Sequence, residues 1–302
     1  MWDLKHRLVY CPIYKVASGT WTTNFLRLSS FNSDLPKWQR FSKLHNASES
    51  VSRKLFPPPK GKKKQLKALK DSTKFLVVRH PFDRIVSAYK GKIARPDAKP
   101  RFYRKLQKEI KAKYSKNSKE IAQEIPPTFE EYWRYLIDMT EGLVHPRDWR
   151  DIDCVQAFYS VCVPCDVEYD VIVKLETHDE DTEYLIRKYQ LKELQEPFTM
   201  WKHNSKGENQ IGDYDYYVYD DPKMNPIQVT SSPKPLASSE KSLASEIEAD
   251  GERKVNEKEE YKKLLFNQLT KTQIRKLYEN YKIDFEMFDY DIEEFLEYAK
   301  NR

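Results

Sequence analysis

Two short segments of the chain combine basic and hydroxyl residues in patterns suited to binding phosphate. The first, residues 15–21, begins with Lys15 and continues through small and hydroxyl-bearing side chains to Trp21. Small side chains let main-chain N–H groups approach an anion, and Gly19 tolerates unusual backbone conformations. The composition predicts an anion-binding loop, and the alternative is an ordinary connection that carries a surface lysine.

The second segment, residues 79–89, places a serine about two turns of helix beyond an arginine. Arg79 precedes Pro81, which suits the first position of a helix, and Ser87 lies eight residues after Arg79. A guanidinium fork and a hydroxyl together are a suitable pair for one phosphate group. The alternative is that Arg79 makes a structural salt bridge.

Each segment follows a predicted buried strand and opens a predicted helix. Residues 7–11 and residues 74–78 are short apolar runs rich in β-forming residues. After the first run, Trp21, Phe25 and Leu28 recur at the spacing of one helix face. A helix N-terminus offers free N–H groups, and ligands of open α/β sheets bind beyond the carboxyl ends of strands. The first segment lacks the spacing of a Walker A loop, which disfavours an ATPase or GTPase.

Together these segments resemble the Golgi carbohydrate sulfotransferases, in the branch that contains chondroitin and dermatan 4-O-sulfotransferases and the natural-killer-epitope sulfotransferase. Members carry a similar loop for the 5′-phosphosulfate, and a similar Arg-x-Pro-Phe-x-Arg motif for the 3′-phosphate, of 3′-phosphoadenosine 5′-phosphosulfate. Two further blocks of the chain fit the branch: Cys-x-Pro-Cys and the strand after it in residues 162–177, and a Leu/Tyr/Phe-rich block in residues 269–290. The four blocks stand in the family order and span almost the whole chain.

The resemblance implies a carbohydrate sulfotransferase that transfers a sulfuryl group from this donor to a sugar hydroxyl of a glycosaminoglycan or glycoprotein glycan. It implies a three-layer, P-loop-like α/β fold with a central, mainly parallel sheet flanked by helices. We expect residues 1–302 to form a single domain, with residues 204–257 as a disordered insertion because they are rich in Ser, Pro, Glu, Lys and Asp. The expected donor-binding residues are Lys15, Val16, Ala17, Ser18, Gly19, Thr20, Trp21, Arg79 and Ser87.

Sulfuryl transfer needs a nucleophilic hydroxyl, an aligned donor and stabilisation of the leaving phosphate. We expect Lys15 to contact the bridging and 5′-phosphate oxygens, in a scheme that needs no metal. Many relatives have His-Trp shortly before the Cys-x-Pro-Cys block, where this chain has Cys154-Val155. His145 is therefore the candidate general base. The alternatives are a nucleotide-binding relative that has lost catalysis and an unrelated basic, kinase-like or polyanion-binding module.

Four other residues bear on the comparison with the family. Tyr14 stands where relatives often have proline, and Thr22 where they often have a basic residue. His80 lies inside the 3′-phosphate motif, and we expect it to be a scaffold residue. Glu176 follows a predicted strand and suits either action on a sugar hydroxyl or a structural ion pair.

Charge is concentrated in two parts of the chain. The formal net charge is +6, and residues 60–70 and 99–119 are rich in lysine and arginine. The two stretches suit either solvated surfaces or a basic rim that attracts an acidic polysaccharide such as chondroitin or dermatan. A neutral glycan is also an acceptable acceptor, whereas nucleic acid is disfavoured because no recognised binding motif accompanies the charge.

Cysteine content and apolar runs bear on the compartment. Four cysteines are compatible with two disulfides, in three pairings, and Cys-x-Pro-Cys lacks a second pair at zinc spacing. Asn46 begins an N-glycosylation sequon. The sequence contains neither an apolar run of 18 residues nor a visible signal peptide. Because the resembled enzymes are Golgi membrane proteins, we expect a Golgi-lumenal catalytic region that lacks its anchor.

The remaining periodicity predicts three helices and a strand. Residues 129–137 are aromatic and predict a helix, and residues 169–173 predict a core strand. Residues 179–189 predict a helix with Tyr184, Leu185 and Tyr189 as its apolar positions. A capping box at residues 270–273 predicts the start of a C-terminal helix.

Overall fold

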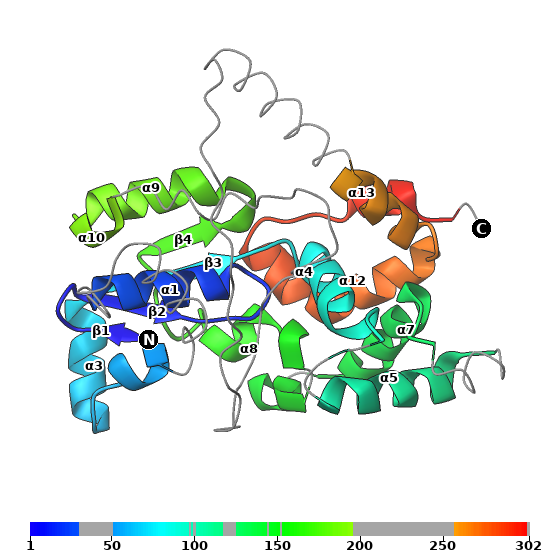
Figure 1. Cartoon of the computed structure of the whole chain (residues 1–302), viewed down its shortest axis with the longest axis horizontal. Helices are drawn as coiled ribbons and strands as arrows, with labels where there is room; N and C mark the ends of the chain where they lie inside the picture. The colour runs from blue at the N-terminus through cyan, green and yellow to red at the C-terminus, as the bar shows by residue number, and fades with distance from the viewer. Residues whose placement is uncertain are drawn as a thin grey trace, which may run out of the picture.

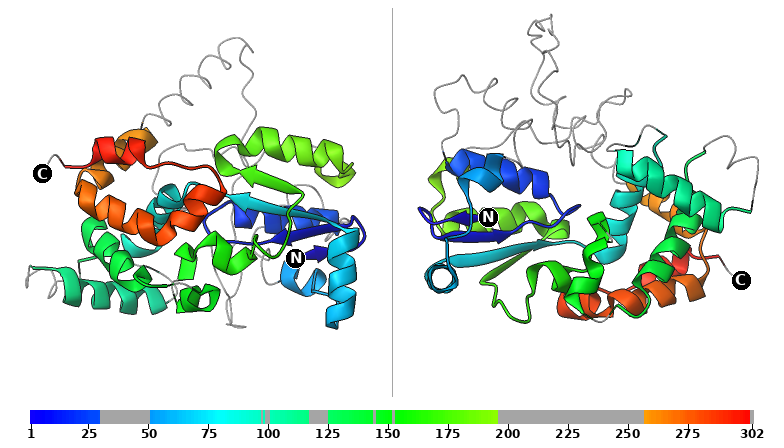
Figure 2. Two further views of the ribbon diagram at one scale, coloured as in Figure 1. Left: turned by 180° about the vertical axis from the view of Figure 1, so that it is seen from behind. Right: turned by 90° about the horizontal axis from the view of Figure 1, so that it is seen from below.

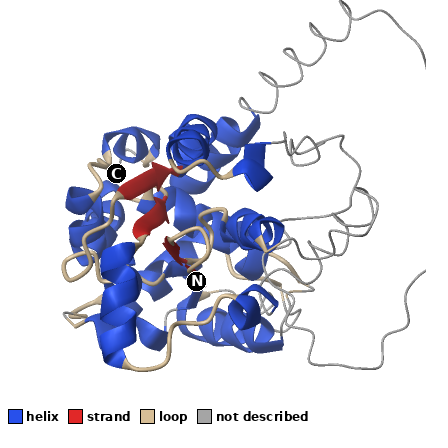
Figure 3. Ribbon diagram, turned by 90° about the vertical axis from the view of Figure 1, so that its left-hand side faces the viewer, coloured by secondary structure: helices blue, strands red, loops and turns tan. Residues whose placement is uncertain are grey.

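A four-stranded sheet with strand order β1-β2-β3-β4 lies in one half of the molecule, with helices around it (Figures 1 and 3). β2 (Leu8–Cys11) and β4 (Val171–Lys174) pair in parallel with β3 (Thr73–Val78), and β1 (Trp2–Asp3) is antiparallel to β2. The mixed α/β class and the mainly parallel sheet are therefore confirmed. This computed structural model describes residues 1–29, 51–96, 98, 101–116, 125–143, 145–151, 153–195 and 257–300.

β3 is an interior strand of the sheet, and its sequence explains that position. Phe75, Leu76, Val77 and Val78 are all fully buried, as expected for a parallel strand covered on both faces. In the register of the sheet Cys11 pairs with Leu76, so β2 and β3 run side by side to the same edge. Both predicted phosphate-binding segments leave the sheet at this edge.

A helix follows each of the three parallel strands. After β2, α1 (Ser18–Leu28) buries the predicted stripe of Trp21, Phe25 and Leu28. α4 (Pro81–Ala88) follows β3, and Pro81 is its first residue as predicted. α9 (His178–Lys188) follows β4 through the short turn η4 (Leu175–Thr177).

One predicted core position of α9 is wrong. Leu185 is fully buried, but Tyr184 is 54% exposed. The phenol hydroxyl of Tyr184 accepts a hydrogen bond from the ammonium of Lys188 one turn later. Its amphipathic side chain therefore stays at the surface, held by a neighbour in the same helix.

A helical layer lies beside the carboxyl edge of the sheet (Figures 1 and 2). α7 (Phe129–Thr140) and α12 (Lys271–Met287) pack on each other, and both begin with capping boxes. The predicted helix at residues 129–137 and the C-terminal capping box are thus confirmed. Further described helical elements are α3 (Lys62–Asp71), η1 (Tyr89–Ile93), α5 (Arg101–Tyr114), η2 (Pro146–Asp151), η3 (Asp153–Val155), α8 (Phe158–Cys162), α10 (Lys192–Gln195) and α13 (Glu293–Tyr298). Residues 51–55 and 257–266 are helical as well.

The two basic stretches form separate surfaces. α3 and α5 lie at opposite ends of the molecule (Figures 1 and 2). α3 precedes β3, so it stands by the amino end of that strand, away from the carboxyl edge. In α5, Lys111 is buried in an ion pair with Glu131, with 3.0 Å between Nζ and Oε2. The described parts of these stretches therefore do not make one basic rim.

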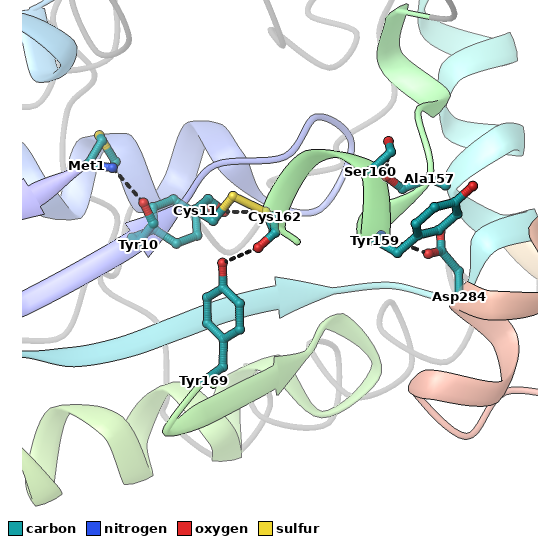
Figure 4. The surroundings of a disulfide bond; sticks show 9 residues. All are labelled: Met1, Tyr10, Cys11, Ala157, Tyr159, Ser160, Cys162, Tyr169 and Asp284. Carbon is teal, nitrogen blue, oxygen red and sulfur yellow. Dashed lines mark hydrogen bonds between the residues drawn. A yellow bond between two sulfur atoms is a disulfide. The ribbon is translucent and has the colours of Figure 1, made fainter. Parts of the chain in front are cut away.

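One disulfide ties the end of β2 to α8 (Figure 4). Cys11 and Cys162 are 151 residues apart in sequence, with 5.9 Å between their Cα atoms. Tyr169 supports this join, because its hydroxyl donates to the main-chain oxygen of Cys162 at 2.9 Å. Neither Cys154, which is buried, nor Cys165, which is exposed, takes part in a disulfide, so the structure contains one of the two disulfides that four cysteines allow.

Some sequence predictions fall outside the described residues. These are the sequon at Asn46 and, apart from its last residue, the insertion predicted at residues 204–257. Within the described part of the chain, no helix is both long and apolar enough to cross a lipid bilayer.

The disulfide is expected to contribute strongly to stability because it closes a long loop in the unfolded chain. The double variant Cys11→Ser/Cys162→Ser should lose about 2–5 kcal/mol of unfolding free energy, measured by urea denaturation. The matched control Cys165→Ser alters an exposed cysteine outside the disulfide and should stay within about 0.5 kcal/mol of the wild type. Equal stability of the double variant and the wild type would contradict this role.

Candidate functional site

The two predicted phosphate-binding segments meet at the carboxyl edge of β2 and β3. Arg79 leaves the end of β3, and its Nη1 donates to the main-chain oxygen of Lys15 at 3.3 Å. Residues 64 positions apart are thereby joined directly. Arg79 and Ser87 are both partly exposed.

The first segment has an unusual backbone. Lys15 and Ala17 have φ values of 69° and 58°, in the left-handed region that residues with a Cβ rarely adopt. Ala17 is the N-cap of α1, and among the described residues no side chain caps this helix end. No acidic residue occupies the first turn of α1. The positive end of the helix therefore keeps its N–H groups and dipole for an anion.

The predicted residues of this segment have different surroundings. Ser18 is buried at the start of α1, whereas Gly19 and Thr20 are partly exposed. Val16 and Trp21 are fully buried in the core around the sheet, with the Trp21 ring 4.6 Å from that of Phe75. Val16 and Trp21 therefore have only their main-chain groups to offer a ligand.

Arg84 is a buried arginine that connects three segments around the site. It projects from α4 and is 2% exposed. Its Nε donates to the main-chain oxygen of Tyr14 at 3.0 Å, and its Nη1 donates to that of Gln156 at 2.6 Å. Its Cζ lies 4.6 Å from the ring centroid of Phe158. The helix of the second segment therefore holds the residue that directly precedes Lys15.

Asp284 of α12 provides the acidic group near this arginine. Its carboxylate accepts hydrogen bonds from the main-chain N–H groups of Phe158 at 2.7 Å and Tyr159 at 3.1 Å. Figure 4 shows it beside the start of α8. Burial raises the pKa of Asp284 to about 6, while these two hydrogen bonds and the charge of Arg84 act to lower it. Burial lowers the pKa of Arg84, and nearby Tyr281 and Asp284 act to raise it.

His80 anchors the second segment to the C-terminal helices. Its Nδ1 accepts from the N–H of Phe82 at 3.1 Å, and its Nε2 lies 2.7 Å from the main-chain oxygen of Asp291. This pattern requires a neutral ring with the proton on Nε2. Burial lowers the pKa of His80 and so favours the neutral form. These contacts support the predicted scaffold role.

Glu176 also joins the second segment to the C-terminal part of the chain. Its carboxylate accepts from the main-chain N–H of His80 and from the hydroxyl of Tyr290, each at 2.9 Å. Of the two roles left open by the sequence, these contacts favour the structural one.

The predicted general base lies apart from these contacts. The side chain of His145 is exposed, and its main-chain N–H donates to Asp148 at 3.1 Å. Cys154, which replaces the histidine of relatives, is buried, with its Sγ 3.1 Å from the hydroxyl of Tyr103. No described contact joins His145 to Lys15 or Arg79. Its role as a base stays a prediction.

Comparison with known proteins assigns the chain to a family. A sequence profile described as "Sulfotransferase family" matches residues 1–220. The chain belongs to the sulfotransferase family. The resemblance seen in its motifs is therefore confirmed.

Curated relatives of this sulfotransferase are named as carbohydrate sulfotransferases. Carbohydrate sulfotransferase 12 of Xenopus laevis is 31% identical over 211 residues, which are 64% of this chain and 48% of the relative. Carbohydrate sulfotransferase 11 of Rattus norvegicus is 31% identical over 191 residues, covering 61% of this chain and 51% of the relative. Carbohydrate sulfotransferase 14 of Danio rerio is 28% identical over 187 residues, covering 61% of this chain and 46% of the relative. The chain spans about half the length of these relatives, and no solved structure matches it.

The family-like motifs contain Arg84 and Asp284, but sequence reasoning gave neither residue a part in the candidate site. A signal for Arg84 exists, because it occupies a position between Pro81 and Ala88 on the buried face of α4. An arginine at an apolar position of a helix indicates a buried charge with specific partners. For Asp284 we find no comparable local signal, since its surroundings come from α4 and α8.

Loss of Arg84 should destabilise the sulfotransferase strongly. Arg84→Met removes the donors for two main-chain oxygens and leaves the carboxylate of Asp284 without nearby positive charge, so we expect a loss of about 3–5 kcal/mol in urea unfolding. The double variant Arg84→Met/Asp284→Asn should lose less unfolding free energy than the sum of the losses of the two single variants. The control Arg187→Met changes an exposed arginine of α9 and should have little effect. If the two single losses add up to the loss of the double variant, Arg84 and Asp284 do not stabilise each other.

His80 should make stability depend on pH. Burial lowers the pKa of His80 in the folded protein. As the pH falls through about 6.5, the histidine is therefore protonated in the unfolded chain before it is protonated in the folded chain. The free energy of unfolding decreases as a result. His80→Asn keeps an N-cap acceptor but removes this titration. Urea denaturation should show that the free energy of unfolding decreases more between pH 7.5 and pH 5.5 in the wild type than in His80→Asn.

The wild type must be compared with His80→Asn because Asp284 also titrates between pH 7.5 and pH 5.5. Its pKa is raised to about 6, so its own contribution makes the fold more stable as the pH falls towards 4. That contribution is common to both proteins and cancels in the difference. Equal pH dependence of wild type and His80→Asn would rule out the proposed titration.

Proposed function

We propose that the chain is a carbohydrate sulfotransferase domain that uses 3′-phosphoadenosine 5′-phosphosulfate as donor. The family and its relatives' names support sulfuryl transfer to a sugar. The observation that carries the proposal is the hydrogen bond from Arg79 to the main-chain oxygen of Lys15, which unites both segments at the carboxyl edge of the sheet. A three-layer, P-loop-like arrangement belongs to the same proposal.

The chemistry assigns a part to each group at this edge. The Lys15 ammonium and the first N–H groups of α1 would hold the 5′-phosphate, because both carry positive charge and belong to one short segment of the chain. Arg79 and Ser87 would hold the 3′-phosphate. The acceptor oxygen attacks sulfur, the bond from sulfur to the 5′-phosphate oxygen breaks, and the hydroxyl proton passes to a base. The products are a sulfate ester and 3′-phosphoadenosine 5′-phosphate.

The base in this scheme is proposed to be His145, whose exposed ring is accessible to a sugar. In the described part of the chain, no group of three or more His, Cys, Asp or Glu residues is arranged to hold a metal ion. The proposed scheme uses none. The proposed acceptor is a glycosaminoglycan or glycoprotein glycan, with chondroitin or dermatan as the first to test. The disulfide supports an oxidising compartment, and we propose the Golgi lumen.

A second candidate function is nucleotide binding without turnover. The burial of Cys154 favours it, because the position that carries histidine in many relatives has no accessible base here. Both functions require the donor site, and only the first requires turnover.

Calorimetric titration with 3′-phosphoadenosine 5′-phosphate and with 5′-AMP tests the donor site. We expect the wild type to prefer the doubly phosphorylated nucleotide. Arg79→Ala should weaken its binding by about 10- to 100-fold, because charge-assisted hydrogen bonds contribute about 1.5–3 kcal/mol, and should remove the preference. Arg187→Ala, on the exposed surface of α9, is the matched control and should bind like the wild type.

Sulfate transfer from the labelled donor to chondroitin, dermatan or a neutral glycan is the second readout of this experiment. Transfer by the wild type supports the enzyme, whereas nucleotide preference without transfer to any acceptor supports the second candidate. Equal or absent binding of both nucleotides by folded wild type would refute the donor site.

A further inference from the structure

The ammonium of Lys15 is held at a glycine that the sequence motifs do not single out. The Lys15 side chain is 2% exposed, so its position is defined by the protein around it. A Cβ atom placed on Gly91 would lie 3.2 Å from Nζ of Lys15. That separation is tighter than most contacts that real Cβ atoms make. A methyl group at position 91 would therefore require the ammonium or the turn to move by a few tenths of an ångström.

Gly91 lies in a π-helical turn, which is a rare form of helix often found at functional sites. The turn, η1, directly follows α4, the helix that carries Ser87. The N–H of Ala94 donates to the main-chain oxygen of Tyr89 at 2.8 Å and closes the wide turn. The second phosphate-binding helix and the glycine are thus parts of one continuous element.

A side chain from α5 fixes this turn. The amide nitrogen of Gln107 donates to the main-chain oxygens of Ile93 at 2.8 Å and Arg95 at 2.7 Å. Gln107 is buried, so these hydrogen bonds are protected from water. Contacts between η1 and α5 therefore help to set the position of Gly91.

The other end of Lys15 is fixed as well. Its main chain is left-handed, with φ of 69°, and its oxygen accepts the hydrogen bond from Arg79. With the main chain held at one end and Gly91 at the other, the side chain has a defined direction. A defined direction matters for an ammonium that must stabilise charge on a leaving group.

We propose that Gly91 is a positioning residue for the Lys15 ammonium and so for the 5′-phosphate end of the donor. This inference rests on the proposed function for the identity of the ligand. The contact between Gly91 and Lys15 stands independently of that function, and the two parts can be tested separately.

The contact is tested by thermal unfolding of four proteins: the wild type, Gly91→Ala, Lys15→Ala and the double variant. Gly91 has a φ that other residues adopt, and alanine favours helices over glycine, so the substitution alone should stabilise the turn. We expect Gly91→Ala to raise Tm by about 2–4 °C in the Lys15→Ala background, and by clearly less in the wild-type background, where the new methyl group meets the ammonium. Equal Tm increases in both backgrounds would overturn the contact.

The role in donor binding is tested by calorimetry with the same proteins. Gly91→Ala should weaken binding of 3′-phosphoadenosine 5′-phosphate and of 5′-AMP by the same factor, about 3- to 10-fold, because both share the 5′-phosphate. The preference for the 3′-phosphorylated nucleotide should stay. In the Lys15→Ala background, Gly91→Ala should not weaken nucleotide binding further. A general disturbance of the fold would weaken binding in both backgrounds.

The outcomes separate the two hypotheses. A wild type that does not prefer 3′-phosphoadenosine 5′-phosphate over 5′-AMP refutes the proposed donor and with it the role of Gly91 in donor binding, whatever the Tm values. A wild type with that preference, combined with unchanged affinity in Gly91→Ala, refutes the positioning role and leaves the function intact.

Discussion

A buried guanidinium is the constraint on which the rest of the structure depends. Arg84 can be stable inside the protein only when its donors find acceptors and its charge finds an opposite charge. The acceptors are the main-chain oxygens of Tyr14 and Gln156, and the acidic group nearby is Asp284. These partners come from the end of β2, from the segment before α8 and from α12. Satisfying one side chain therefore fixes three parts of the chain around α4.

The same arrangement explains why the molecule has a sheet half and a helical half that meet at the candidate site. The sheet brings its parallel strands to one edge, and the disulfide between Cys11 and Cys162 holds α8 against that edge. The helical half supplies Asp284 and the groups around His80. Rigid elements on both sides thus support a loop whose backbone has a left-handed conformation at Lys15 and Ala17.

The sequence predicted the features that depend on local pattern. The strands β2, β3 and β4, the helices that follow them and the capping boxes came from apolar runs, periodicity and cap residues, which report local structure directly. The features it missed depend on distant partners. The acceptors of Arg84 are main-chain oxygens of Tyr14 and Gln156, which the sequence pattern of α4 does not identify. The pairing of Cys11 with Cys162 joins residues 151 positions apart. The π-helical turn around Gly91 depends on Gln107 from another helix.

The C-terminal helices have a consequence for how this gene can be expressed. The family profile ends at residue 220, yet His80, Phe158 and Tyr159 all bond to residues beyond 257. A splice form or stop codon that kept only the matched part would retain every residue predicted to bind the donor. It would also expose the aromatic surface under α12 and α13 and remove the charge that balances Arg84. Such a product would keep the motifs and the core around the sheet while losing much of the second hydrophobic core, which the C-terminal helices complete.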